Sequence, residues 1–401
     1  MTETVKKPGY IDLSELAISI GVLLYFIAVI VVNQVDSAVT SGFYYIAIIL
    51  CFVFYAVYKR EFSMSPVVFF ALGGIFLATV NFAEVGNIKL LPCFILFSSF
   101  FLAMIFLSPK VNDNTFLIAV FLNAFVVAVK LGLHGLNTPV YVDSSNNYIS
   151  IHLLSPALLY YTRLDLGKKK MPLYPVAVIW ILCLLAGGRG GVLACTILAF
   201  GVVMRRYLSN PKDRRSRIKL LFILTVLMIP ATLIILQYLV SRLSGLYVMD
   251  RFMNKGLDGG GRLDCWTEYI QNAFKSTKNF LFGVPLDEVS WAIRYKGNLH
   301  NSFLFVHAYT GFFGLAFLLG MLIRAAAYAI RNHMGVYLCC LFTLCFRGMT
   351  DHMFGVNRHT VVVLAMVFIP ICMALQMKQK GTEDAYISCY TGAGRLQGNP
   401  Q

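Results

Sequence analysis

The chain is built from long apolar segments that alternate with short polar connections. About 12 of these segments are long and apolar enough to be membrane-crossing helices, which need roughly 17–25 mostly apolar residues. They centre on residues 13–33, 43–58, 66–83, 90–107, 116–133, 148–162, 172–186, 190–204, 220–240, 302–323, 334–348 and 360–377. Because the apolar stretches are continuous and do not alternate with polar positions, the pattern predicts an all-α polytopic transmembrane bundle and not a β-barrel.

The apolar segments, one long interruption between them and a polar end divide the chain into four parts. We expect an N-terminal bundle of about nine spans in residues 1–240. A large loop in 241–300 and the C-terminal spans in 301–377 follow, and 378–401 form a polar tail.

The large loop contains its own helical pattern. Leu263, Trp266, Ile270 and Phe274 recur at intervals of three or four residues. This spacing predicts an amphipathic helix that lies on the bundle or at the membrane interface.

The composition agrees with a membrane protein. Hydrophobic residues make up 58% of the chain and charged residues only 13%, whereas soluble domains average about 25% charged residues. These values exclude an ordinary soluble enzyme, a disordered chain and a secreted disulfide scaffold. Most of the 10 cysteines lie in apolar runs and none form a closely spaced ligand pair, so we expect no metal site and no cofactor.

The excess of basic residues gives an orientation. The net charge is +15, from 34 Lys and Arg against 19 Asp and Glu. Such a charge can indicate nucleic-acid binding, but here Lys and Arg gather in every second loop, which is how cytoplasmic loops are marked. The densest run, 205–219, is then a cytoplasmic loop, although binding to anionic lipid is an alternative. Both termini are expected in the cytoplasm and the loop 241–300 outside it.

Two arginines on the expected outer side are candidate ligand residues. Arg189 lies between two pairs of glycines, where an arginine is costly unless it is paired or faces water. Arg262 follows three glycines at the start of the amphipathic helix, where free backbone amides favour an anion. The alternatives are an arginine that reaches up to the membrane interface for Arg189 and a solvated surface arginine for Arg262.

Histidines and a polar loop supply further candidates. His300 and Asn301 precede the tenth span, and the spacing of seven residues would place His300 and His307 on one helix face. Gly311 and Gly314 permit close helix packing. A short outer loop adds three more candidate site residues, Arg347, Asp351 and Arg358. There, Asp351 either forms a structural ion pair with one of the two arginines or takes a direct role.

These residues carry a resemblance. His300-Asn301 followed after nine residues by Gly311 and then Gly314 resembles the pattern of the O-antigen ligase and polymerase superfamily. The glycine-flanked Arg189, the Arg262 that opens the large loop, and the last outer loop with Arg347, Asp351 and Arg358 are similar to that family's in order and position.

The resemblance implies a glycosyltransferase of the GT-C type in the bacterial inner membrane. It would transfer a glycan, with inversion, from an undecaprenyl-diphosphate carrier to a sugar hydroxyl at the periplasmic face, with neither metal nor cofactor. His300 would be the catalytic base, and Arg189 and Arg262 would hold the diphosphate. Asn301, Arg347, Asp351 and Arg358 would support them.

The resemblance leaves the acceptor open. A surface-polysaccharide repeat-unit polymerase extends another carrier-linked glycan, whereas an O-antigen ligase loads lipid A–core. The stretches 143–150, 281–286 and 300–304 look more similar to polymerases. Membrane lipids, a chain-length regulator and a flippase would be further partners, and nucleic acid would not. A precursor transporter is the remaining alternative, but it would need ionisable residues deep in several spans, and Arg189 is the one clear candidate.

Overall fold

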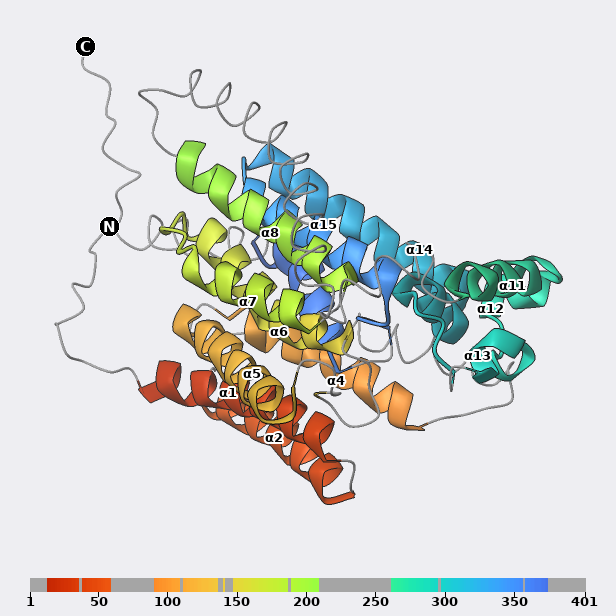
Figure 1. Ribbon diagram of the computed structural model, residues 1–401, viewed down its shortest axis with the longest axis horizontal. Coiled ribbons are helices and arrows are strands. Elements are labelled where there is room, and N and C mark those ends of the chain that lie inside the picture. Colours follow the sequence, from red (N-terminus) through yellow and green to blue (C-terminus); the bar gives the residue numbers. More distant parts are fainter. Residues whose placement is uncertain are drawn as a thin grey trace, which may run out of the picture.

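The computed structural model describes residues 13–35, 38–58, 90–108, 111–135, 140, 147–186, 189–208, 261–294, 297–355 and 358–373. All regular structure in these ranges is helical (Figure 1), which confirms the predicted fold class. The bundle helices are α1 (Leu13–Gln34), α2 (Ala38–Tyr58), α4 (Leu90–Phe106), α5 (Asp113–His134), α6 (Asn147–Leu166), α7 (Tyr174–Leu185), α8 (Arg189–Leu208), α14 (Ser302–Arg331) and α15 (Gly335–Thr350). A final apolar helix covers Thr360–Met373.

Three of these helices, α1, α5 and α14, are both long and apolar enough to cross a membrane. Shorter apolar helices match the expected spans at 43–58, 172–186, 334–348 and 360–377. Helices α4, α6 and α8 coincide with the segments expected at 90–107, 148–162 and 190–204. The spans predicted at 66–83 and 220–240 and the tail at 378–401 lie outside the described residues. The full number of about 12 spans therefore stays a prediction.

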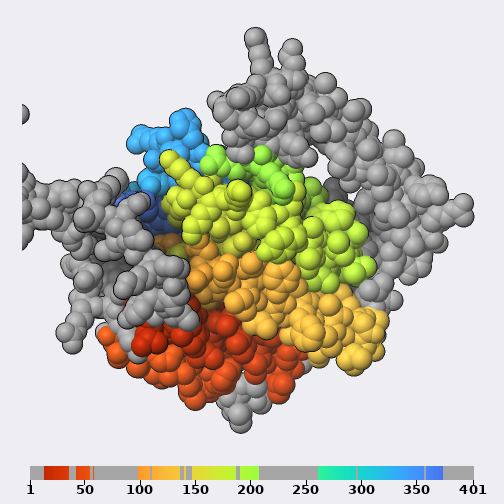
Figure 2. Space-filling model, turned by 90° about the vertical axis from the view of Figure 1, so that its left-hand side faces the viewer, coloured from red at the N-terminus to blue at the C-terminus, as the bar shows by residue number. Residues whose placement is uncertain are grey.

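Helix α6 forms the centre of the bundle, and nearly all of its residues from Ile149 to Asp165 are buried. Figure 2 shows the surface of one end of the bundle, where the helices follow one another in chain order from red through orange and yellow to green. An apolar helix that is covered on all sides belongs in the middle of such a bundle.

Two carboxylates, the buried Asp165 and the partly buried Asp113, tie one end of the bundle together. Asp165, near the end of α6, accepts hydrogen bonds from the backbone N–H groups of Val336 and Tyr337, both at 3.0 Å. It thereby caps α15, whose own preceding residue makes no side-chain cap. Arg163 donates to Asp113 at 2.7 Å. The end of α6 and the starts of α5 and α15 therefore lie at one end, and the start of α6 and the end of α15 lie at the other.

The described part of the large loop folds into four short helices at this second end (Figure 1). They are α11 (Arg262–Phe274), α12 (Thr277–Phe282), the 3₁₀ turn η2 (Leu286–Glu288) and α13 (Ser290–Arg294). Together with the start of α14 they enclose a small apolar core of their own.

Helix α11 coincides with the predicted amphipathic helix, and most of its apolar stripe does not face the protein core. The residues that face the small core are Cys265, Tyr269 and Ala273. Leu263 and Phe274 are 56% and 72% exposed. Leu263, Ile270 and Phe274 of the apolar stripe therefore point outward, whereas Trp266 packs against the small core.

Helix α14 is kinked where it meets this loop. Gly311 has φ 63° and ψ −167° inside the helix, a conformation that glycine adopts at little cost. A Cβ at this position would lie 2.0 Å from the carbonyl oxygen of Leu281 at the end of α12. The close approach expected from Gly311 is therefore made by a loop helix, not by another span.

Candidate functional site

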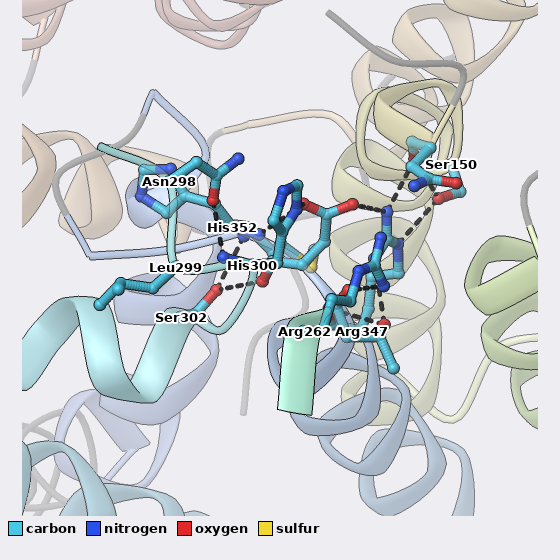
Figure 3. Close-up of polar contacts among 12 residues, drawn as sticks. Ser150, Arg262, Asn298, Leu299, His300, Ser302, Arg347 and His352 are labelled. Atoms are coloured by element: carbon cyan, nitrogen blue, oxygen red, sulfur yellow. Dashed lines mark hydrogen bonds and ion pairs between the residues drawn. The ribbon is translucent and has the colours of Figure 1, made fainter. Parts of the chain in front are cut away.

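A polar cluster occupies the second end of the bundle, where α6, α11, α14 and α15 meet (Figure 3). It contains Ser150 from α6, Arg262 from α11, His300 from the connection before α14, and Arg347 and Asp351 from the end of α15. Residues separated by some 200 positions in sequence thus form one site.

Arg347 is almost fully buried, with only 1% of its surface exposed. Its Nε donates to Ser150 Oγ at 2.8 Å, and its Nη2 donates to the Asn147 carbonyl at 2.7 Å. Nη1 donates to Thr350 Oγ1 at 3.1 Å. Nη2 also donates to Asp351 Oδ2 at 3.1 Å. Nε and Nη2 therefore join α15 to the start of α6, and Nη1 bonds within α15 itself.

Asp351 is the carboxylate that completes this arrangement. It is fully buried, and it pairs with Arg347, which decides between the two arginines considered from the sequence. Its Oδ1 accepts from the backbone N–H of His352 at 2.9 Å. Burial alone would raise the pKa of Asp351, but the charge of Arg347 and the contact with His300 outweigh it and hold the pKa well below its usual value. Asp351 is therefore a permanent negative charge.

His300 lies beside this carboxylate. Its Nδ1 is 3.4 Å from Asp351 Oδ1, and its side chain is 17% exposed. The residue has φ 49°, and its backbone N–H donates to Asn298 Oδ1 at 2.8 Å. Because this left-handed conformation is unfavourable for a residue with a Cβ, it needs support from its surroundings. The imidazole is thus aimed by the backbone at the carboxylate.

The expectation that His300 and His307 share a helix face is wrong. Helix α14 begins only at Ser302, so His300 precedes it. His307 instead joins the loop to α14: its Nε2 lies 2.9 Å from the Phe280 carbonyl and its Nδ1 lies 2.7 Å from the Tyr269 hydroxyl. Since a carbonyl only accepts, Nε2 carries the proton, and in the neutral ring Nδ1 accepts from the tyrosine.

Asn301 and Ser302 organise the start of α14. Asn301 is the N-cap, and its Oδ1 accepts from Phe303 N at 2.9 Å and Leu304 N at 3.2 Å. Ser302 Oγ donates to the Asp351 carbonyl at 2.9 Å and accepts from Met353 N at 2.7 Å. Ser302 was not among the candidates, because a serine at a helix start is common in any sequence. It fixes the Asp351 loop to the helix that follows His300.

Arg262 reaches the cluster from the first turn of α11. Its Nη1 donates to the Thr350 carbonyl at 2.7 Å, and its charge helps to lower the pKa of Asp351. The preceding Gly261 has φ 82°, and a Cβ there would lie 2.6 Å from the ring of Trp291. Only glycine allows this turn, which directs Arg262 away from the loop core and toward α15.

Arg189 begins α8 at the same end of the bundle, and its side chain lies outside what the structure describes. The two residues after it locate the start of the helix. A Cβ at Gly190 would lie 3.0 Å from Thr350 Oγ1, and one at Gly191 would lie 2.4 Å from Ser150 Cβ. The backbone of Arg189 is therefore adjacent to the cluster.

Arg358 makes its contacts outside the polar cluster, against α1 and α2. Its guanidinium carbon lies 5.4 Å from the centre of the Tyr44 ring in α2, and its carbonyl accepts a hydrogen bond from the Tyr25 hydroxyl. The next residue, His359, contacts Ser155 Oγ at 2.9 Å through Nδ1. Arg358 thus anchors the last outer loop to α1 and α2.

Among the residues that the structure describes, no group of three or more His, Cys, Asp or Glu side chains could hold a metal ion. The cluster instead presents two cationic guanidinium groups and one imidazole around one permanent carboxylate, Asp351. Such a set can bind an anion and transfer a proton.

The apolar helices and the polar cluster at their end define the protein as an all-helical membrane protein. The family model described as O-antigen ligase matches residues 174–319, and this match supports membership of the O-antigen ligase and polymerase superfamily. The matched segment contains Arg189, Arg262 and His300, whereas the α15 residues of the cluster lie beyond it. No curated protein matches the chain.

Proposed function

We propose that the protein transfers a glycan from a polyprenyl-diphosphate carrier to a sugar hydroxyl at the outer face of the bacterial inner membrane. The observation that carries the proposal is the meeting of Arg262, His300 and Asp351 in a chain that matches the O-antigen ligase family. The reaction needs a cation for the departing diphosphate and a base for the hydroxyl, and this cluster holds both.

The diphosphate of the carrier is an activated leaving group, so the protein has to bind and stabilise its charge. A guanidinium group offers paired N–H donors that match phosphate oxygens. Arg262 enters the cluster from the loop, and Arg189 begins a helix whose next residue adjoins Thr350. The two arginines would hold the diphosphate between them and stabilise the negative charge that grows on it as it leaves.

The acceptor hydroxyl loses its proton to His300. With Nδ1 donating to Asp351, the lone pair of the imidazole is on Nε2, which is the atom that accepts the proton. The 3.4 Å separation of Nδ1 and Oδ1 is longer than a strong hydrogen bond, as is common before substrate binds. Asp351 keeps the ring oriented and stabilises the imidazolium that forms.

In the transfer itself, the hydroxyl oxygen forms a bond to the anomeric carbon as the bond from that carbon to the diphosphate oxygen breaks. The electron pair leaves with the polyprenyl diphosphate, and the proton goes to His300 Nε2. Attack opposite the leaving group inverts the anomeric centre. The charge is neutralised by arginines, so this chemistry requires no metal or cofactor.

Within this activity we propose a repeat-unit polymerase, in which the acceptor is a second carrier-linked glycan. The support is the similarity of the stretches 143–150, 281–286 and 300–304 to such enzymes. A polymerase would work with a flippase and a chain-length regulator. The O-antigen ligase is the second candidate, since the matched family model carries that description, and its acceptor would be lipid A–core.

Deletion of the gene followed by gel analysis of the cell's glycolipids separates the two candidates. Loss of a polymerase should leave lipid A–core with a single repeat unit, or remove a capsule while the core stays unchanged. Loss of a ligase should leave the core bare while polymer accumulates on the carrier. Unchanged surface glycans would contradict both and favour a transporter. Complementation with His300→Ala should reproduce the deletion, and His333→Ala, an exposed histidine at the opposite end, should restore the wild-type pattern.

A further inference from the structure

The residues of α11 divide into three faces. One faces the small loop core through Cys265, Tyr269 and Ala273. A second is polar and includes Asp264 and Gln271. The third consists of Leu263, Ile270 and Phe274, which are 56%, 44% and 72% exposed. With 3.6 residues per turn, this apolar face lies about 120° around the helix from the core face. An exposed face of three large apolar side chains is costly in water.

A row of stacked rings connects this apolar face to α14. Phe274 stacks on Phe280 of α12 with ring centres 5.5 Å apart, and Phe280 stacks on Phe312 of α14 at 4.9 Å. Phe313 continues the row at 5.7 Å. Figure 1 shows α11 and α12 beside the first part of α14. The apolar face of the loop is therefore continuous with the side of a membrane-crossing helix.

The row ends where α14 becomes exposed. No residue from Ser302 to Gly311 is exposed, because the loop helices cover this part of α14. From Phe312 onward, the helix presents a succession of exposed apolar side chains, among them Phe317 and Ile323. Since α14 is long and apolar enough to span the membrane, these side chains lie against lipid. The lipid surface consequently begins at the level of the aromatic row.

Basic side chains flank the same region. Lys275 follows Phe274 directly, Lys278 lies in α12, and both are exposed. Lysines beside an apolar face suit the phosphate groups of lipid headgroups, as in helices that lie in the membrane interface. The continuity with α14 and the lysines point to the same occupant, a lipid bilayer.

We infer that α11 lies in the outer surface of the membrane that the chain spans, with Leu263, Ile270 and Phe274 inserted among the lipids. The membrane boundary then follows the row Phe274–Phe280–Phe312. Because Arg262 begins this helix, the bilayer would set the height at which that arginine enters the polar cluster. The lipid acts here as a partner that holds the loop in position.

Tryptophan quenching by brominated lipid tests this inference. The full-length protein is placed in vesicles of phosphatidylcholine with or without bromine on the acyl chains. Phe274→Trp puts a new fluorophore on the apolar face, and Gln271→Trp puts one on the polar face of the same helix. The native tryptophans are present in both variants, so the wild-type emission is subtracted.

The emission added by Phe274→Trp should be blue-shifted and mostly lost in brominated vesicles, whereas that of Gln271→Trp should persist. Ile270→Trp is a second probe of the apolar face and should behave like Phe274→Trp. Equal quenching of all three variants, or no quenching of the two apolar ones, would overturn the inference. The measurement needs no glycan substrate, so its outcome is independent of the proposed transfer activity.

Discussion

At the scale of single residues, Arg347 at the end of α15 and Arg262 at the start of α11 have different roles. Arg347 is buried and uses Nε and both Nη atoms within the protein. Arg262 is only half-buried, at the edge of the cluster, and it is held by the Thr350 carbonyl. Arg347 therefore builds the site, and Arg262 is placed to meet a substrate.

Replacing Arg262 with lysine should impair transfer while the protein remains folded in the membrane. Lysine keeps the charge but cannot present paired donors. A charge-assisted hydrogen bond contributes about 1.5–3 kcal/mol, so we expect a fall in rate of roughly tenfold or more. The rate of polyprenyl-diphosphate release measures it. Arg189→Lys should behave similarly, and Arg294→Lys, a surface arginine that covers Trp291, should not. Normal rates in both Arg262→Lys and Arg189→Lys would refute the diphosphate clamp.

Replacing Asp351 with asparagine should destabilise the protein as well as slow transfer. The change leaves the buried Arg347 without its anionic partner, which costs about 3–5 kcal/mol. Thermal unfolding in detergent should show a clear decrease in Tm, whereas Asp264→Asn, at an exposed position of α11, should show none. An unchanged Tm for Asp351→Asn would mean that the ion pair carries no stability.

The pH dependence of this pair has a definite sign. Because the pKa of Asp351 is lower in the folded protein than in the unfolded chain, ionisation stabilises the fold above the unfolded pKa of about 3.9. That stability is lost as the pH falls toward the lower, folded pKa. Between about pH 5 and 8 the contribution should therefore be constant, and the difference in Tm between wild type and Asp351→Asn should not change.

The residues of the site were predictable from sequence to the extent that they are unusual. A histidine before a span and arginines beside glycines stand out in an apolar chain, and His300 and Arg262 both lie near Asp351. Ser150 and Ser302 do not stand out, because serines are common at helix starts. The separation of Arg358 from the cluster depends on its contact with Tyr44, a non-local contact that no local pattern contains.

At the scale of elements, the kink of α14 joins the loop to the membrane bundle. Gly311 admits the end of α12, and His307 bonds to Tyr269 and Phe280 on the two loop helices. Since α11 also carries Arg262, this joint fixes the arginine relative to His300.

Gly311→Ala should therefore loosen the loop and reduce transfer. The new methyl group would overlap the Leu281 carbonyl oxygen, 2.0 Å away, at a backbone φ that alanine avoids. Protease cleavage within 261–294 should become faster. Gly320→Ala is a matched control in the same helix, because nothing lies within 4 Å of its Cβ position. If Gly311→Ala cleaves and transfers like Gly320→Ala, the joint is not what positions the loop.

Element boundaries were well predicted because apolar runs are local properties of the chain. The outward direction of the apolar face of α11 was not, since Cys265, Tyr269 and Ala273 carry no stronger burial signal than Leu263 and Phe274. What covers α11 depends on the partners that folding brings to it. In this protein the loop core covers Cys265, Tyr269 and Ala273, and Leu263 and Phe274 remain on the outside.

At the scale of the whole molecule, each end of the bundle has its own set of polar residues. Asp113, Asp165 and the basic residues Arg163 and Arg205 pair at one end, and the His300 cluster lies at the other. This separation agrees with the alternation of basic loops, and from that alternation we expect the Asp165 end in the cytoplasm.

A reporter fused at residue 275 should therefore lie outside the cytoplasm, and one fused at residue 333, in the turn between α14 and α15, should lie inside it. Cys265 is a free, buried thiol, so a membrane-impermeant reagent should label it only after the loop is opened. Cytoplasmic activity of the reporter at 275 would reverse the orientation and remove the periplasmic site.

The most direct measurement is transfer by the purified protein in vesicles that contain a polyprenyl-diphosphate-linked repeat unit as both donor and acceptor. The account predicts longer glycans on the carrier, one polyprenyl diphosphate released for each bond formed, and neither product from His300→Ala at equal abundance. If lipid A–core is the only acceptor used, the same chemistry belongs to a ligase. Full activity of the His300→Ala protein, with Asp351 and Arg262 intact, would contradict the account at its centre.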